Sequence, residues 1–120
     1  MKKVYQFEIW NINLNPTKGS EQSGMRPALI IETNATQNQG NTTIVIPLTS
    51  KIDPVFTFDV LLEPNTKNGL IQKSKLKIRQ VRVIDKTRLF KNIGRIDDPH
   101  TQKKILETLK MVFDCEQLFV

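Results

Sequence analysis

The sequence predicts a mainly β domain, a compact and partly open barrel of five or more antiparallel strands closed by one C-terminal helix. Five segments rich in Ile, Val, Phe and Thr, separated by Asn, Gly, Pro and Asp, precede any helical pattern. These segments are Phe7–Leu14, Ala28–Glu32, Thr42–Thr49, Val55–Glu63 and Lys75–Ile84. A chain of 120 residues is expected to form one domain, residues 1–120, with a real core.

Alternation of apolar and polar residues supports the third and fourth segments as strands. In Val55–Glu63, the residues Phe56, Phe58, Val60 and Leu62 share one parity, which predicts that they face inward. In Thr42–Thr49, Pro47 cannot donate to a β-ladder and therefore predicts an edge or bulge position. Thr49 is expected near the end of that strand.

The fifth segment changes parity partway along. Leu76 and Ile78 alternate with the basic residues Lys75, Lys77 and Arg79. Val81 and Val83, in contrast, occupy the same alternate positions as those basic residues. One extra residue near Arg79 or Gln80, a β-bulge, would restore the pattern, and a strand that crosses from one barrel face to another gives the same pattern. In the bulge interpretation, Gln80 and Arg82 project together.

The end of the chain predicts two helical elements. Residues 85–89 favour a short helical turn, and Asp98 followed by Pro99 is typical of a helix N-cap and first turn. Apolar residues then recur at helical spacing and predict one stripe packed on the sheet: Ile105, Leu106, Leu109, Val112 and Phe113.

Composition excludes several classes of function. No apolar run is long enough to cross a membrane and no signal peptide is visible, so we expect a cytoplasmic protein with no membrane partner. Cys115 and His100 are the only cysteine and histidine. The chain therefore has no internal disulfide, no zinc site of His and Cys ligands and no pair of catalytic histidines, and we expect no metal or cofactor. His100 is expected to be an exposed surface residue.

The net charge of +6 is unevenly distributed. Between Lys67 and Arg95 the chain has ten basic residues against Asp85 alone. Such a basic belt attracts phosphates and favours nucleic-acid binding, although a solvated lysine-rich face has the same composition.

The segment from Asn15 to Pro27, with sequence NPTKGSEQSGMRP, is the most informative local feature. Gly19 and Gly24 permit turns closed to other residues, and Pro27 disfavours helical geometry at Arg26. We therefore expect a polar loop that ends with an extended, directed arginine at the entrance of a strand.

This loop resembles the loop between the first two strands of the MazF/PemK family of bacterial toxins. The resemblance extends over nearly the whole chain in four ordered blocks: Glu8-Ile9-Trp10, Arg26 to Ile31, Pro47 to Ser50, and Gln80 to Leu89. It implies an SH3-like barrel with a terminal helix, a homodimer, and a cognate antitoxin peptide. It also implies metal-independent, sequence-specific cleavage of single-stranded RNA (mRNA, tRNA or rRNA) that leaves 2′,3′-cyclic phosphate and 5′-hydroxyl ends.

The resemblance implies catalytic roles for Arg26 and Thr49. RNA supplies its own nucleophile, the 2′-hydroxyl, so the protein mainly has to position the phosphate and stabilise transition-state charge. Arginine offers a permanently charged planar fork and threonine a compact hydroxyl, and neither is an obvious base. A loop flap over the RNA and two strand residues are the expected RNA contacts: Lys18, Ser20, Glu21, Gln22, Gln80 and Arg82.

Two positions depart from the family pattern. Phe7-Glu8 replaces the usual glycine-aspartate pair, and Arg79 stands where some relatives have an acidic residue. If that carboxylate is a base in those relatives, this chain uses another route or cuts more slowly.

Two other functions remain open from the sequence. One is a non-catalytic toxin of the same barrel that binds a protein, such as a gyrase poison of the CcdB type, and the other is an RNA-binding module without turnover. The apolar C-terminal residues are expected at a subunit interface, against antitoxin, or in the protomer's own core: Phe113, Leu118, Phe119 and Val120.

Overall fold

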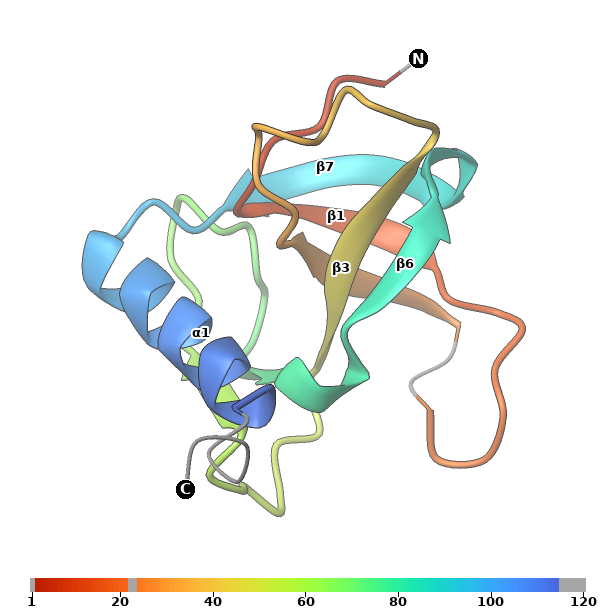
Figure 1. Ribbon diagram of the computed structural model, residues 1–120. Coiled ribbons are helices and arrows are strands. Elements are labelled where there is room, and N and C mark those ends of the chain that lie inside the picture. The colour runs from red at the N-terminus through yellow and green to blue at the C-terminus, as the bar shows by residue number, and fades with distance from the viewer. Residues whose placement is uncertain (1, 22–23, 115–120) are drawn as a thin grey trace.

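The computed structural model describes residues 2–21 and 24–114, and within them the chain forms an antiparallel barrel with one helix (Figure 1). The strands run in the order β4-β5-β3-β2-β1-β7, with β6 also paired to β3. Their bounds are β1 Glu8–Asn13, β2 Met25–Ile30, β3 Thr42–Thr49, β4 Asp59–Leu62, β5 Ser74–Lys77, β6 Arg82–Asp85 and β7 Leu89–Arg95. The predicted mainly β barrel with a C-terminal helix is confirmed.

Strand β3 is central, and this corrects the edge position predicted from Pro47. One side of β3 pairs with β2, where Pro47 lies opposite Ala28. The other side pairs with β6 along Thr42–Val45 and with β5 at Leu48 and Thr49. Pro47 lies between those two pairings, where no ladder donor is needed, so a central strand tolerates it.

The parity change after Lys77 is a crossing between sheets, and the bulge interpretation is wrong. Strand β5 pairs with β4 and β3, the 3-10 turn η1 (Ile78–Gln80) interrupts the strand, and β6 then pairs with the first half of β3. The predicted short helical turn is confirmed as η2 (Lys86–Arg88), whose backbone is capped by the Asp85 side chain.

Strand β2 begins three residues before the predicted Ala28, and strands β4 and β7 also differ from the sequence prediction. Strand β4 begins only at Asp59, so Phe56 is exposed and Phe58 is half-buried, whereas Val60 and Leu62 are buried as predicted. Strand β7 was not predicted, because it is an edge strand with Gly94 near its end and an exposed Phe90, and so lacks clear alternation.

Helix α1 (Pro99–Val112) begins where the sequence predicts and packs beside η1 and β4. The Asp98 side chain accepts hydrogen bonds from the backbone of His100 and Thr101, and the hydrogen bond from the Thr101 hydroxyl lowers the pKa of Asp98. Ile105 is fully buried, and Leu109 and Val112 pack on the core. Leu106 and Phe113 are exposed, so the apolar stripe is narrower than predicted. No helix in the described part of the chain is both long and apolar enough to cross a membrane.

The sheet is covered on both faces. One core contains Ile9, Leu29, Ile46, Leu76 and further residues that extend to Ile105 of α1. The alternate residues of the same strands form a second core under the N-terminal segment: Val4, Trp10, Ile12, Leu14, Ala28, Ile30, Val45, Ile84 and Leu89. Burial on both faces explains why residues 28–31 are continuously apolar.

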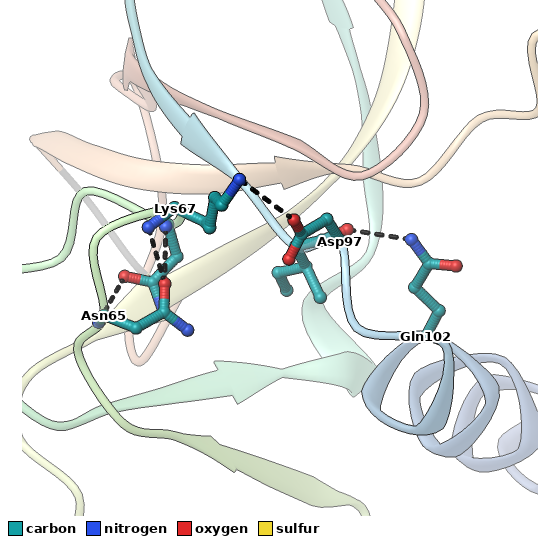
Figure 2. Close-up of polar contacts among 6 residues, drawn as sticks. Asn65, Lys67, Asp97 and Gln102 are labelled. Carbon is teal, nitrogen blue, oxygen red and sulfur yellow. Dashed lines mark hydrogen bonds and ion pairs between the residues drawn. The ribbon is translucent and has the colours of Figure 1, made fainter.

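A turn between β4 and β5 closes the seam between β4 and β7, the two ends of the sheet. The side chains of Asn65 and Asn68 organise this turn, and the Lys67 carbonyl accepts a 2.9 Å hydrogen bond from the backbone of Arg95 in β7. The Lys67 ammonium lies 3.8 Å from the Asp97 carboxylate, and the Gln102 side chain of α1 donates to the Ile96 carbonyl at 2.8 Å. Figure 2 shows Lys67 extending toward Asp97. At the seam the backbone of this turn therefore lies close to the backbone of β7.

We predict that Gly94→Ala destabilises the fold by about 1–3 kcal/mol or more, because a side chain would be forced into a packed contact. A Cβ at Gly94 would lie 2.4 Å from the Asn68 carbonyl carbon. Urea unfolding monitored by circular dichroism measures the effect. Gly40→Ala is the matched control because a Cβ there meets nothing within 4 Å. Equal unfolding midpoints for the two variants would contradict the prediction.

Candidate active site

The arginine predicted to be directed by its loop lies on a strand. Arg26 is the second residue of β2 and is opposite Ile12 of β1, and its side chain is exposed. The preceding loop has positive φ at Gly19 (56°) and Gly24 (79°), as its glycines predict. The Gly24 carbonyl accepts a 3.0 Å hydrogen bond from the backbone of Leu14, which holds the two ends of the loop together. The extended backbone at Arg26 thus presents its side chain from the sheet.

Thr49 is the last residue of β3, where it lies opposite Lys75 of β5. Its hydroxyl oxygen accepts a 3.1 Å hydrogen bond from the backbone of Lys51. The side chain is half-buried at the start of the connection to β4. Its predicted position at the strand end is confirmed.

Arg26 and Thr49 line the same pocket, which has a volume of about 290 Å³. The remaining lining comes from β1, β2, β3, β5 and β7, from Ser50 after β3 and from the turn before β5: Asn11, Met25, Pro27, Leu48, Ser50, Gly69, Leu70, Ile71, Gln72, Ser74 and Ile93. Folding therefore brings a permanent cation and a hydroxyl from different strands to one concave surface. That pair is suited to bind and polarise a phosphate.

A second pocket, of about 520 Å³, adjoins the first, and Thr49 lines both. Ser20 and Gln80 line it, and the Gln80 side-chain amide donates to the Ser20 carbonyl at 3.4 Å. In Figure 1 the orange β1–β2 loop and the yellow-green β3–β4 connection extend from the same lower side of the barrel. The structure thus places two of the predicted RNA contacts beside Thr49.

The other predicted contacts lie elsewhere. Lys18 and Glu21 are exposed and form a turn in which the Glu21 carboxylate accepts a 2.5 Å hydrogen bond from the backbone of Lys18. Neither residue lines either of the two pockets. Gln22 lies outside the described residues. Arg82 is half-buried and its guanidinium donates to the Leu14 carbonyl at 3.1 Å, so it holds the base of the loop.

Arg88 acts on the same loop base, because its guanidinium donates to the carbonyls of Asn13 and Asn15. We predict that Arg88→Ala increases tryptic cleavage after Lys18 several-fold, since the ends of the loop lose these hydrogen bonds. Mass spectrometry of timed digests measures the rate. Lys91→Ala, an exposed change on β7, is the control. Identical digestion rates at Lys18 for both variants would show that Arg88 does not restrain the loop.

Sequence reasoning missed several residues of the second pocket. Its lining includes Lys51, Asp53, Pro54, Phe56, Phe58, Asp59, Lys75, Lys77 and Arg79. The two phenylalanines were predicted to be core because their parity matches Val60 and Leu62. The signal that could have placed them outside is Pro54, whose missing amide donor disfavours a continuous ladder.

The basic belt is not one solvated face. Lys75 and Lys86 are buried, Lys67 pairs with Asp97 at 3.8 Å, and Lys73 pairs with Glu63 at 3.2 Å. Lys77 and Arg79 remain at the larger pocket. Partial burial lowers the pKa of Lys77, the charge of Lys75 lowers it further, and Asp59 opposes the shift. Lys51, Lys77 and Arg79 are thus the basic residues that line the larger pocket besides the buried Lys75.

Comparison with known proteins identifies the family of this fold and site. Residues 5–113 match the family described as the PemK-like, MazF-like toxin of type II toxin–antitoxin systems. The chain belongs to this family. The resemblance inferred from the four sequence blocks is thus confirmed.

Curated MazF relatives are similar over most of their length. The chain is 35% identical to endoribonuclease MazF9 of Mycobacterium tuberculosis over 112 residues, 89% of this chain and 93% of the relative. It is 32% identical to endoribonuclease EndoA of Bacillus subtilis over 101 residues, 83% of this chain and 86% of the relative.

Solved MazF structures share the fold. MazF from Deinococcus radiodurans superposes with a TM-score of 0.75 at 21% identity, covering 94% of this chain and 97% of that chain. A mycobacterial endoribonuclease solved in complex with its cognate antitoxin gives a TM-score of 0.71 at 18% identity, covering 94% and 95%.

Phe7, where this chain departs from the family pattern, has an unusual backbone conformation. Phe7 has a φ of 71°, a region that glycine enters at little cost and that is unusual for a bulky residue. Its amide donates to Ile30 and its carbonyl accepts from Ile96, both at 2.8 Å, so paired backbone holds the conformation. The glycine that the resemblance to the family implies at this position would fit this geometry.

Proposed function

We propose that this chain is the toxin of a type II toxin–antitoxin system and acts as a sequence-specific endoribonuclease on single-stranded RNA. The observation that carries the proposal is that Arg26 and Thr49, which come from different strands, line one pocket. Membership of the PemK/MazF family and relatives named endoribonucleases support the same activity.

In this proposal the 2′-hydroxyl of the substrate loses its proton to solvent and attacks the adjacent phosphorus. The bond to the 5′-oxygen of the next nucleotide breaks, and that oxygen takes up a proton from solvent. The products are a 2′,3′-cyclic phosphate and a 5′-hydroxyl. Arg26 would bind the non-bridging oxygens and stabilise the added negative charge, which grows in the transition state. Thr49 would donate a hydrogen bond from its hydroxyl to a phosphate oxygen, while its hydroxyl oxygen accepts a hydrogen bond from the backbone of Lys51. The proposal includes no metal or cofactor.

The RNA contacts proposed around this centre differ in their structural support. Ser20 and Gln80 line the pocket that adjoins Thr49, which favours contact with a neighbouring nucleotide. Lys18, Glu21 and Gln22 are proposed as contacts through the β1–β2 loop. Arg82 is proposed as a contact as well, although its bond to Leu14 also favours a role in loop placement.

Partners and location follow from the same proposal. A solved structural neighbour contains a cognate antitoxin, and we propose an antitoxin peptide as the natural inhibitor of this chain. We also propose a homodimer acting in the cytoplasm, where the substrate mRNA is translated, with tRNA and rRNA as further substrates.

The test is to incubate the purified chain with a long single-stranded RNA in EDTA and to map cut positions and end chemistry. Discrete cuts with cyclic phosphate ends support the proposal. Intact RNA would contradict it and would favour a barrel toxin that acts by binding a protein such as gyrase. Cuts that occur only when Mg²⁺ is restored would contradict the metal-independent step.

A further inference from the structure

Two phenylalanines expected in the core, the exposed Phe56 and the half-buried Phe58, instead line the larger pocket. Phe56 is 52% exposed, and its ring centroid lies 5.1 Å from that of Phe58 with the planes tilted by 31°. The guanidinium carbon of Arg79 lies 4.4 Å from the Phe58 ring centroid, a cation–π contact. All three side chains line the pocket of about 520 Å³ that includes Thr49. We call these three residues the aromatic platform.

The aromatic platform is held by a buried ion pair. The Asp59 carboxylate accepts a 2.9 Å hydrogen bond from the backbone of Phe56 and lies 3.5 Å from the Lys75 ammonium. Lys75 also donates to the Pro54 carbonyl at 2.7 Å. Both charged side chains are at most 7% exposed. The connection that carries Phe56 is thus attached to β5, and the two rings lie at the pocket above these contacts.

The charges around the aromatic platform favour a nucleic acid over an apolar peptide. Lys51, Lys77 and Arg79 line the pocket, whereas Asp53 is the acidic lining residue besides Asp59, which is already paired with Lys75. Every nucleobase has a flat face that stacks on aromatic rings or guanidinium planes, and the phosphates of the nucleic-acid backbone attract ammonium groups. The lining therefore matches both parts of a nucleotide.

We propose that Phe56, Phe58 and Arg79 form a stacking site for one unpaired base of the RNA, next to the cleaved phosphate. The inference rests on the proposed ribonuclease function and adds a subsite to it. Thr49 lines both pockets, so a strand with its reactive phosphate at Arg26 and Thr49 reaches the aromatic platform with a neighbouring nucleotide. Stacking tolerates different bases, and Gln80 in the same pocket has an amide that can hydrogen-bond to a base edge.

The test uses short oligonucleotides that contain the cut sequence mapped with wild-type protein. In each oligonucleotide one base that flanks the cut site is removed, which leaves an abasic ribose at that position. For wild type, we expect one abasic position to lower kcat/KM by about tenfold, within the roughly 5- to 150-fold range of base–aromatic stacking. Phe58→Leu should lower kcat/KM by a similar factor on the intact oligonucleotide. The same abasic change should then cost Phe58→Leu little more, because both changes remove one interaction.

Two further variants keep the test decisive. Arg79→Lys keeps the charge but loses the planar guanidinium, and should show a smaller loss at the same abasic position. Tyr5→Leu is the matched control, since Tyr5 is 51% exposed and lies outside the pocket. Circular dichroism and a thermal melt check that each variant folds.

The outcomes separate this proposal from the proposed function. If wild type cuts RNA while Phe58→Leu and Arg79→Lys match it in rate and in abasic profile, the stacking site is overturned and the ribonuclease stands; the surface would then serve a protein partner. If a well-folded wild type cuts no RNA, both proposals fail. Additive losses from Phe58→Leu and the abasic change would also overturn the stacking site, because they would show two separate interactions.

Discussion

Arg26→Ala is expected to lower the rate of RNA cleavage by about 100- to 1,000-fold, the usual effect of removing one group that stabilises transition-state charge. Arg26 is exposed on β2, so its loss should leave folding stability nearly unchanged. Arg26→Lys should recover only part of the rate, because an ammonium keeps the charge but loses the two-pronged donor geometry. Single-turnover cleavage of an end-labelled RNA measures these rates.

Thr49 offers a finer comparison within the same experiment. Thr49→Ser keeps a hydroxyl and should retain most activity, whereas Thr49→Ala should lose it, since the pocket then lacks that donor. Similar rates for wild type and Arg26→Ala, with discrete cuts in both, would remove Arg26 from the site. Similar rates for the alanine and serine variants at position 49 would remove the Thr49 hydroxyl from the mechanism.

Breaking the buried ion pair beneath the aromatic platform is expected to have the largest effect on stability. Lys75→Met should lower the free energy of unfolding by about 3–5 kcal/mol, because it leaves the Asp59 carboxylate buried without its cation. The ammonium and carboxylate lie 3.5 Å apart, with side chains that are 7% and 5% exposed. Urea unfolding followed by circular dichroism measures the change.

The double variant Lys75→Met with Asp59→Leu provides the internal control. It should be more stable than Lys75→Met alone, since no uncompensated charge remains. Lys73→Met is the surface control, because the Lys73–Glu63 pair is largely exposed and such pairs contribute about 0–1 kcal/mol. Equal losses for Lys73→Met and Lys75→Met would show that burial of the Lys75 pair has no special effect.

Local sequence patterns predicted the elements that depend on neighbouring residues. The Asp98-Pro99 start of α1, the turn at 86–88 and all of β3 were anticipated, because capping, turn chemistry and alternation act within a few residues. The strand predictions were wrong where contacts between distant segments decide whether and where a strand forms. Strand β7 forms because β1 offers it a partner, although its own alternation is weak.

The candidate site was predicted unevenly for the same reason. Arg26 and Thr49 could be selected from the loop motif and from resemblance to the family, but the pocket that they share depends on pairing between strands far apart in the chain. Lys75 is an example of what local sequence patterns do not predict. Its place in the basic belt predicts a surface residue, yet its side chain is buried against Asp59. Nothing within a few residues of Lys75 in the sequence indicates that partner.

The sequence by itself determined the mainly β character, the terminal helix, the extended arginine before Pro27 and the membership of the PemK/MazF family. Only the tertiary structure decided that residues 75–84 cross between sheets, that Phe56 faces solvent, and that Thr49 lies between two pockets. The physical reason is that alternation of apolar and polar residues shows only which residues share one face of a strand. Which neighbour covers each face is decided by contacts between distant segments, which no local pattern records.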